Sequence, residues 1–250
     1  SNAIDSGAKY KMGNFAFGTR VVSGDITNEN LLENDPVVSS QFEPGRLGFA
    51  NGAAIDSEYN NDKFGLNVSF GNMQESNTLF GVYGDGLLSI NGADTRYVDM
   101  VATYNPLEST KLFARATFAD TSADVRGGMI SYMSDIKSNA FAIGLDMGRF
   151  SLTASMPLAV VSGRMGYDYA EYDVVENDGK YEIAVNNPHV EYIDLASQKR
   201  ELRYTGSYKT PLGEFTDAGF GFIYRVNPNN TDAFGNETIL MFKLHHRLGI

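Results

Sequence analysis

Three histidines are the side chains of this chain best suited to act as a base or to hold a metal near neutral pH. His189 follows Pro188 in an expected loop, whereas His245 and His246 are adjacent in an expected strand. Adjacent strand residues point to opposite faces, so His245 and His246 cannot grip one metal ion together. A serine protease also needs a base beside its nucleophile, and no Gly-x-Ser-x-Gly turn accompanies these histidines. We therefore expect no catalytic residue, metal ligand or cofactor in this chain.

An acidic segment is the second candidate site. Hard cations such as Ca²⁺ bind oxygen ligands, which this segment supplies in number. The spacing does not match an EF-hand loop, and acidity is general here, with 31 acidic and 20 basic residues and a net charge of −11. We therefore interpret the segment as a solvated external loop. Its carboxylates are Asp168, Glu171, Asp173, Glu176 and Asp178, next to Gly179.

Composition limits the class of protein. A chain of 250 residues with 42% apolar residues, 12% aromatic residues and 26 glycines fits one all-β domain of barrel or sandwich size. Its acidity repels phosphate backbones, so we expect no nucleic-acid partner. The absence of cysteine leaves neither a disulfide nor a thiolate metal site. Residues 1–3, Ser-Asn-Ala, resemble the scar of a cleaved expression tag, and we expect one β domain over residues 4–250.

Alternation of apolar and polar residues is the main structural signal. Every second residue of Phe64–Phe70 is Phe, Leu or Val, and Phe141–Met147 and Phe150–Met156 alternate similarly on either side of Gly148-Arg149. A period of two predicts strands, and the short turn predicts a hairpin. The sequence has no window of about 18 uninterrupted apolar residues, which excludes a transmembrane helix.

The last segment of the chain is a strand of the same kind. An outer-membrane barrel ends in this way, because its last strand faces lipid on one side and the lumen on the other. Any antiparallel sheet with one buried face alternates similarly, so this strand alone leaves both interpretations open. In the barrel interpretation its apolar residues form the assembly signal: Leu240, Phe242, Leu244, Leu248 and Ile250.

Further strands are expected along the chain, separated by short turns such as 105–107 and 210–213 and by longer polar segments such as 25–45 and 176–180. Only residues 28–34 could form a short helix. The sequence therefore predicts an all-β, antiparallel up-and-down β-barrel of about 12 strands. The additional expected strands are Phe15–Val22, Leu47–Ile55, Leu79–Ile90, Arg96–Tyr104, Lys111–Ala119, Gly128–Ser134, Arg164–Val174, Tyr181–Tyr192, Lys199–Lys209 and Ala218–Val226.

Such a barrel would turn its mixed strand faces inward. Charged residues recur on these faces, and cations opposite carboxylates would form ion pairs in a polar lumen. The expected lumen cations are Lys111, Arg115, Arg203, Lys209, Arg225, Lys243 and Arg247, opposite Asp99, Asp146 and Glu201.

Several motifs follow one another between about residue 111 and residue 250. They are Ser138–Asp146, Phe150–Gly163 with its Pro-Leu-x-Val-x-Ser-Gly element, Ile193–Leu195, Arg200–Tyr204, Pro211–Gly213, Tyr224–Pro228 and the apolar end of the chain. Their order and spacing resemble the β-barrel region that follows the protease in subtilisin-like autotransported serine proteases of Gram-negative bacteria. None of these motifs is a catalytic signature.

The resemblance implies a monomeric outer-membrane anchor and translocator for an upstream passenger, a subtilisin-like serine protease, with no chemistry of its own. Its partners would be outer-membrane lipid, the barrel-assembly machinery and the passenger. Barrels of this family generally hold a helix in the lumen, and the sequence shows no such helix near residue 4. Two alternatives remain, because inward and outward apolar faces give the same period. One is a soluble periplasmic or cell-surface barrel that binds a lipophilic ligand, and the other is an adhesive or structural β domain.

Overall fold

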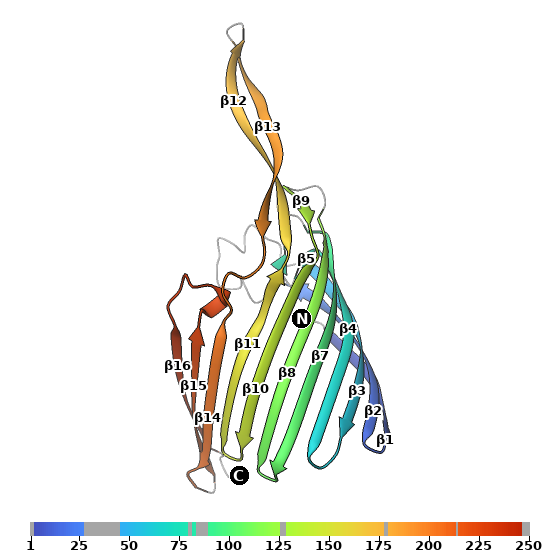
Figure 1. Ribbon diagram of the computed structural model, residues 1–250, viewed down its shortest axis with the longest axis vertical. Helices are drawn as coiled ribbons and strands as arrows, with labels where there is room; N and C mark the ends of the chain where they lie inside the picture. Colours follow the sequence, from blue (N-terminus) through green and yellow to red (C-terminus); the bar gives the residue numbers. More distant parts are fainter. Residues whose placement is uncertain are drawn as a thin grey trace.

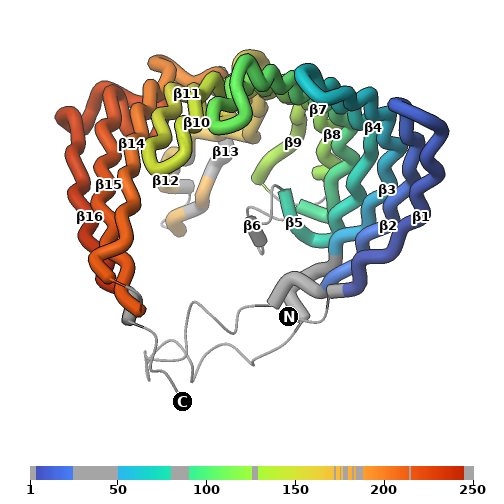
Figure 2. The backbone as a smooth tube through the Cα atoms, turned by 90° about the horizontal axis from the view of Figure 1, so that it is seen from below, coloured from blue at the N-terminus to red at the C-terminus, as the bar shows by residue number. Residues whose placement is uncertain are grey.

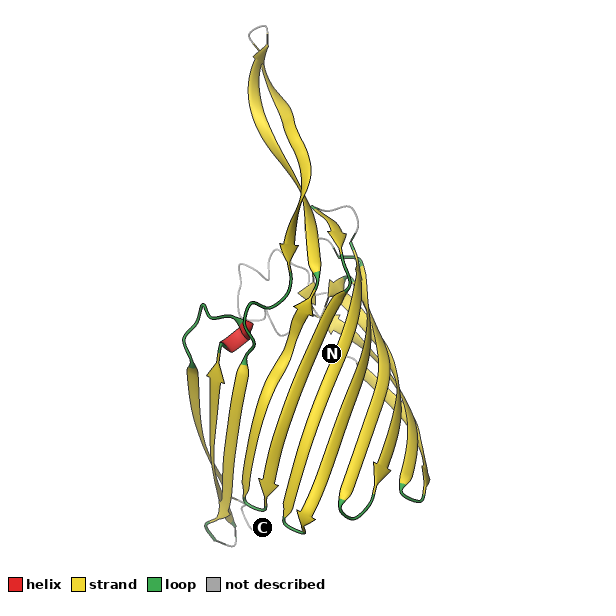
Figure 3. Ribbon diagram, viewed as in Figure 1, coloured by secondary structure: helices red, strands yellow, loops and turns green. Residues whose placement is uncertain are grey.

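The computed structural model shows a chain built almost entirely of strands (Figures 1 and 3). It describes residues 3–27, 46–79, 82–83, 90–125, 129–177, 180–213 and 215–246. Eleven strands form one large antiparallel sheet, which confirms the predicted all-β, antiparallel class. These strands are β1 (Ala3–Met12), β2 (Phe15–Thr27), β3 (Arg46–Asn60), β4 (Phe64–Ser76), β7 (Gly92–Leu107), β8 (Thr110–Asp124), β10 (Ile136–Met147), β11 (Phe150–Ser162), β14 (Leu202–Pro211), β15 (Thr216–Val226) and β16 (Glu237–His246).

The large sheet is a meander that curves around a central space (Figure 2). Its strand order, β1-β2-β3-β4-β7-β8-β10-β11-β14-β15-β16, follows the order of the chain. Within the described residues, no ladder joins the edge strands β1 and β16. The described sheet is therefore an open, curved surface of eleven strands.

Short turns connect the strands at one end of the sheet, which we call the turn end and which is the lower end in Figure 1. The predicted hairpin is confirmed, since Met147 pairs with Phe150 across Gly148-Arg149. Gly148 has a φ of 56° and Gly13, in the β1–β2 turn, a φ of 59°. Two-residue hairpin turns need this left-handed conformation, which glycine adopts without steric cost.

The opposite end, which we call the arm end, carries smaller elements. Strand β12 (Arg164–Asn177) follows β11 after Gly163, and it pairs with β13 (Lys180–Asp194) and with the short β9 (Ile130–Met133). The β12–β13 arm projects well beyond the large sheet (Figure 1). The remaining elements are the strands β5 (Thr78–Leu79) and β6 (Val82–Tyr83) and the 3₁₀ helix η2 (Pro228–Asn230). No helix in the described part of the chain has the length and apolar character needed to cross a membrane.

Some element boundaries differ from the prediction. Strand β1 was not expected, β2 continues to Thr27 into a segment expected to be a turn, and β14 begins at Leu202 rather than Lys199. The expected helix at 28–34 lies outside the described residues. Of the strand expected over Leu79–Ile90, the structure describes only the short β5 and β6 and the final residue.

The placement of His189 in a loop was wrong, because His189 lies within β13. Pro188 suggested a break in the strand, since proline has no N–H group to donate to a ladder. Here the ladder instead shifts its register between Tyr169 and Glu171 of β12, next to this proline. A strand tolerates proline at such an irregularity and at an edge.

Candidate functional site

The two faces of the large sheet differ in burial. Ala54, Ser69, Thr95, Thr121 and Ser138 are all less than 9% exposed, and the register of β3, β4, β7, β8 and β10 places them on one face. On this face the hydroxyl oxygens of Thr95 and Thr121 are 2.9 Å apart. Curvature brings side chains together on the concave side of a sheet and separates them on the convex side. We therefore identify the buried face as the inner face of the curved sheet.

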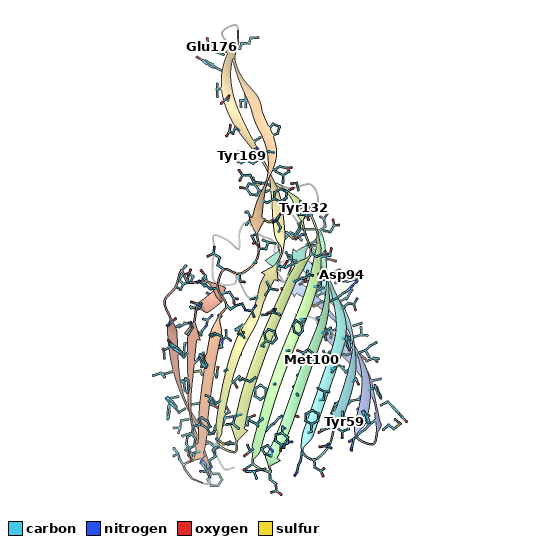
Figure 4. All side chains as sticks on the ribbon, viewed as in Figure 1. Tyr59, Asp94, Met100, Tyr132, Tyr169 and Glu176 are labelled. Carbon is cyan, nitrogen blue, oxygen red and sulfur yellow. The ribbon has the colours of Figure 1, made fainter. Side chains whose placement is uncertain are left out.

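The outer face is apolar and exposed. Phe64, Leu66, Val68 and Phe70 of β4 share one face, as predicted, and pair with Tyr104, Ala102, Met100 and Val98 of β7. The side chains of the sheet, with Met100 and Tyr59 labelled, are drawn in Figure 4. Exposure reaches 56% for Phe70, 64% for Ile143 and 73% for Phe242. Large apolar side chains of the outer face are therefore exposed on the surface rather than packed in a core.

The exposed surface of the whole chain is unusually large. It amounts to 17042 Å² for a mass of 27.4 kDa, whereas a compact soluble protein of this mass exposes roughly 11,000 Å². Few large apolar side chains are buried, Ile130 and Ile136 among them. Grouped apolar side chains such as those of the outer face are typical of surfaces that contact a protein, a ligand or a membrane.

The apolar part of the outer face forms a band with defined limits. Toward the turn end, the Phe15 and Tyr59 rings lie 5.0 Å apart and the Tyr59 and Phe64 rings 6.4 Å apart. Toward the arm end, the band stops at a polar row that crosses four strands. From Phe64 to Phe70 the band extends about 20 Å along the strand. The polar row consists of Asn72, Arg96, Asp120 and Lys137, which pair in this order.

A charged cluster closes the arm end of the last three strands. Glu201, which directly precedes β14, is only 2% exposed. Its carboxylate accepts two hydrogen bonds of 2.9 Å from Arg225 and two, of 2.9 and 3.1 Å, from Arg203. The backbone N–H of Asn229 donates a further bond of 2.8 Å. The hydrogen bonds from Arg225 are the main reason that the pKa of Glu201 falls to about 2.

The same cluster ties the segment around η2 to the sheet. Arg225 also donates a hydrogen bond of 2.6 Å to Glu237 at the start of β16. The side-chain oxygen of Asn230 accepts a hydrogen bond of 3.0 Å from the backbone N–H of Glu201. Asn229 has a φ of 61° and Asn230 a φ of 60°, and asparagine tolerates this left-handed region better than most residues. Glu201 and Arg225 together therefore connect β14, β15 and β16 at one point.

The structure places most of the predicted lumen charges on the inner face. Arg115 Nε lies 2.8 Å from Asp99 Oδ1. Lys111 of β8 lies opposite Asp146 of β10 in the strand register. Glu201 lies just before β14 rather than within a strand. Arg247 lies outside the described residues. The inner-face set is Asp99, Lys111, Arg115, Asp146, Arg203, Lys209, Arg225 and Lys243. Their role in a lumen stays a prediction.

Three residues of the expected assembly signal lie together on the outer face. Leu240, Phe242 and Leu244 are 68%, 73% and 58% exposed, and Phe242 pairs with Phe220 of β15. Leu248 and Ile250 lie outside the described residues, as do the side chains of His245 and His246. Nothing in the described geometry tests the role of this strand in assembly.

Sequence reasoning missed several partners of the charged cluster. Glu237 and Asn229 belong to this cluster. Outside the cluster, the ion pair between Lys9 of β1 and Glu58 of β3 was also missed. These contacts depend on strand register and on the fold of the segment around η2. Alternation shows which residues share a face of one strand but not which residues of two strands meet.

The acidic segment and His189 both lie on the β12–β13 arm, and Asp178 lies outside the described residues. His189 Nε2 is 3.5 Å from a carboxylate oxygen of Glu191. Within the described ranges, no three His, Asp or Glu side chains gather in a way that could hold a metal ion.

Comparisons with known proteins find no counterpart: no family model matches the chain, and neither a curated protein nor a solved structure matches it.

Proposed function

We propose that this chain is the membrane-embedded β-barrel of an outer-membrane protein and that it anchors and translocates a passenger in the manner of an autotransporter. The observation that carries the proposal is the apolar outer face of the sheet, which is paired with a polar inner face. Outer-membrane barrels need this distribution, because lipid surrounds them and water fills or lines the lumen.

Strand length supports the proposal. A transmembrane β-strand needs roughly 9–11 residues when it is tilted by about 45°. The large-sheet strands contain between 10 and 16 residues, so each is long enough. The apolar band is limited by aromatic rings at the turn end and by the polar row at the arm end. At a tilt of about 45°, the length of about 20 Å along the strand gives a band about 14 Å tall, shorter than the band of about 25 Å in such barrels, so the strand lengths rather than the band height support the proposal.

Strand direction indicates how the sheet would close. Eleven strands that alternate in direction leave the edge strands β1 and β16 running the same way. One additional strand of opposite direction would pair antiparallel with both edges, and we propose a closed barrel of 12 strands on this basis. Closure is required in lipid, because each unsatisfied backbone group there costs several kcal/mol.

The translocator role depends on the resemblance of residues 111–250 to autotransporter barrels. A polar inner face with ion pairs such as Arg115–Asp99 is compatible with a route for a polypeptide or with a resident linker. The upstream passenger proposed here is a subtilisin-like serine protease, and the chain itself would supply no chemistry.

A soluble barrel that binds a lipophilic ligand would need apolar side chains on the inner face. The described inner face instead carries mostly small, polar and charged residues, with a minority of apolar side chains such as Val101, Phe113 and Ile223. A hollow of about 980 Å³ does occur in the described part of the chain. Residues of both faces line it, with Ile55, Phe70 and Phe118 from the outer face and Ala54, Tyr97 and Ser138 from the inner face, so its lining does not mark an apolar cavity on the inner face.

The membrane proposal is tested by preparing the chain without detergent and measuring its aggregation by sedimentation and size exclusion. We expect aggregation that a non-ionic detergent relieves, with a folded β spectrum in the micelle. A monodisperse, detergent-free monomer that does not bind a dye for exposed apolar surface would refute the proposal.

A further inference from the structure

The β12–β13 arm leaves most of its edges open. Its two strands pair from Arg164–Asp194 to Asn177–Lys180, whereas β9 reaches β12 only at residues 165–167. No other described strand pairs with either edge of the arm beyond that point. A two-stranded ribbon is marginally stable in water, and an open strand edge is a template for a further strand.

One face of the arm carries strongly exposed apolar side chains, together with the exposed carboxylates of Asp168 and Glu176. Val174 pairs with Ile183, and their exposed fractions are 70% and 73%. Tyr181 lies on the same face at 75%, and Val190 and Tyr192 continue it toward the base of the arm at 38% and 57%. We call these five residues the apolar stripe. Grouped exposure of this kind marks an interaction site, whereas single exposed apolar residues are common on any protein.

The opposite face uses its polar groups within the arm near the base. The Tyr169 and His189 rings lie 5.2 Å apart, and the Tyr167 hydroxyl donates a hydrogen bond to Glu191. Figure 4 labels Tyr169, which lies on this face, and Glu176, which pairs with Tyr181 and lies on the face of the stripe. These contacts hold the two strands together from one side. The apolar stripe is therefore the face that a partner has to cover.

Charge identifies the chemistry of that partner. Residues 164–194 contain eight acidic and two basic residues, and Glu171 and Asp173 are exposed on the face opposite the stripe. The guanidinium of Arg164 already lies 5.8 Å from the Tyr192 ring at the base of the stripe. A second copy of the arm would bring carboxylates toward carboxylates, whereas a cationic strand would meet opposite charge.

We propose that the arm binds an extended segment of another polypeptide, in which apolar residues alternate with lysine or arginine. The segment adds as a strand to an open edge of the arm. Its apolar side chains then lie on the side of the stripe, and its cations lie on the side of Glu171 and Asp173. This inference does not depend on the large sheet spanning a membrane.

The test uses the full chain in a non-ionic detergent and a capped, fluorescein-labelled peptide of four Lys-Val repeats. Fluorescence anisotropy should show saturable binding that weakens with salt. A Glu-Val peptide of the same length, and a peptide with four lysines followed by four valines, should bind at least about tenfold more weakly, because one lacks the charge and the other lacks the alternation.

Variants locate the binding on the arm. The double substitution Val174→Ser with Ile183→Ser should weaken binding by at least about tenfold, because it removes the centre of the stripe. The matched control is Phe234→Ser, which removes a side chain of 61% exposure outside the arm and should leave binding unchanged. Glu171→Gln with Asp173→Asn should reduce the salt dependence.

Hydrogen exchange of the unmodified chain provides a second measurement if a variant does not fold. Peptide binding should slow backbone exchange within 168–177 or 180–192. Equal binding of the Glu-Val peptide, unchanged affinity in the stripe variant or absence of protection in the arm would each overturn the inference. Binding to the arm by a chain that fails to enter membranes would refute only the proposed function.

Discussion

At the scale of single residues, Glu201 is the group on which the structure depends most clearly. It is 2% exposed, and two arginines and one backbone N–H hold its carboxylate. A buried charge is stable only when its hydrogen-bonding capacity is met, and here the partners come from three different segments. Loss of this one carboxylate leaves the charge of Arg225 partly uncompensated.

Substitution Glu201→Gln should destabilise the folded chain by about 3 kcal/mol, because breaking a buried ion pair leaves an unpaired charge. The free energy of unfolding in detergent, from urea titration, measures this effect. The control is Glu58→Gln, which breaks the exposed pair with Lys9 and should cost less than about 1 kcal/mol. Equal effects of the two substitutions would contradict the role assigned to the cluster.

The acid sensitivity of the folded chain should also trace to Glu201. Its pKa is about 2 in the folded chain against an ordinary value of 4.5. A lowered pKa stabilises the fold above the ordinary value, and this contribution is lost as pH falls from about 4.5 toward 2. The loss is on the order of 3 kcal/mol. Urea titrations between pH 7 and pH 3 should show a decline in the unmodified chain that is smaller in Glu201→Gln, and parallel declines would count against this assignment.

At the scale of elements, the sequence predicts which residues share a face of one strand. It does not predict which residues of different strands lie side by side. The face shared by Phe64, Leu66, Val68 and Phe70 follows from alternation alone, and the structure confirms it. The arm strands alternate in the same way as the sheet strands, so nothing in the sequence separates the two. The partners of Arg225 and the position of His189 depend on register, which period two leaves undetermined.

A charge on the outer face should be far more costly than the same charge on the inner face. Ile143→Lys places a cation in the apolar band, whereas Thr153→Lys places one on the inner face beside Gly144. If the band faces lipid, Ile143→Lys should cost about 2–4 kcal/mol in bilayers, and Thr153→Lys should cost much less. Folding equilibria in lipid vesicles measure both, and similar costs would show that the two faces share one environment.

Removal of Leu248–Ile250 should abolish membrane insertion if the terminal strand is the assembly signal. The described part of this strand already carries Leu240, Phe242 and Leu244 on the outer face. Cell fractionation and heat-modifiable mobility on gels report insertion in a Gram-negative host, and removal of residues 1–3 is the control. A truncated chain that assembles as well as the full chain would show that the signal lies elsewhere.

At the scale of the whole molecule, the direction in which the curved sheet turns its apolar face determines which surroundings the protein fits. Large apolar side chains with high exposure, such as Phe70, Ile143 and Phe242, lie on the convex side of the sheet. Alternation could not decide this point, because inward and outward apolar faces give the same period. The curvature of the sheet and the burial of its side chains show which face is concave and which is convex. The proposal that lipid covers the outer face is based on this assignment.

The most direct measurement places single tryptophans on the two faces, since the chain contains none of its own. Met100→Trp and Ile143→Trp lie on the outer face, and Thr153→Trp lies on the inner face. After reconstitution, lipids brominated on the acyl chain should quench both outer tryptophans strongly, while aqueous iodide should quench the inner one. Quenching of the inner tryptophan by bromolipid, or equal iodide quenching at all three positions, would contradict the account.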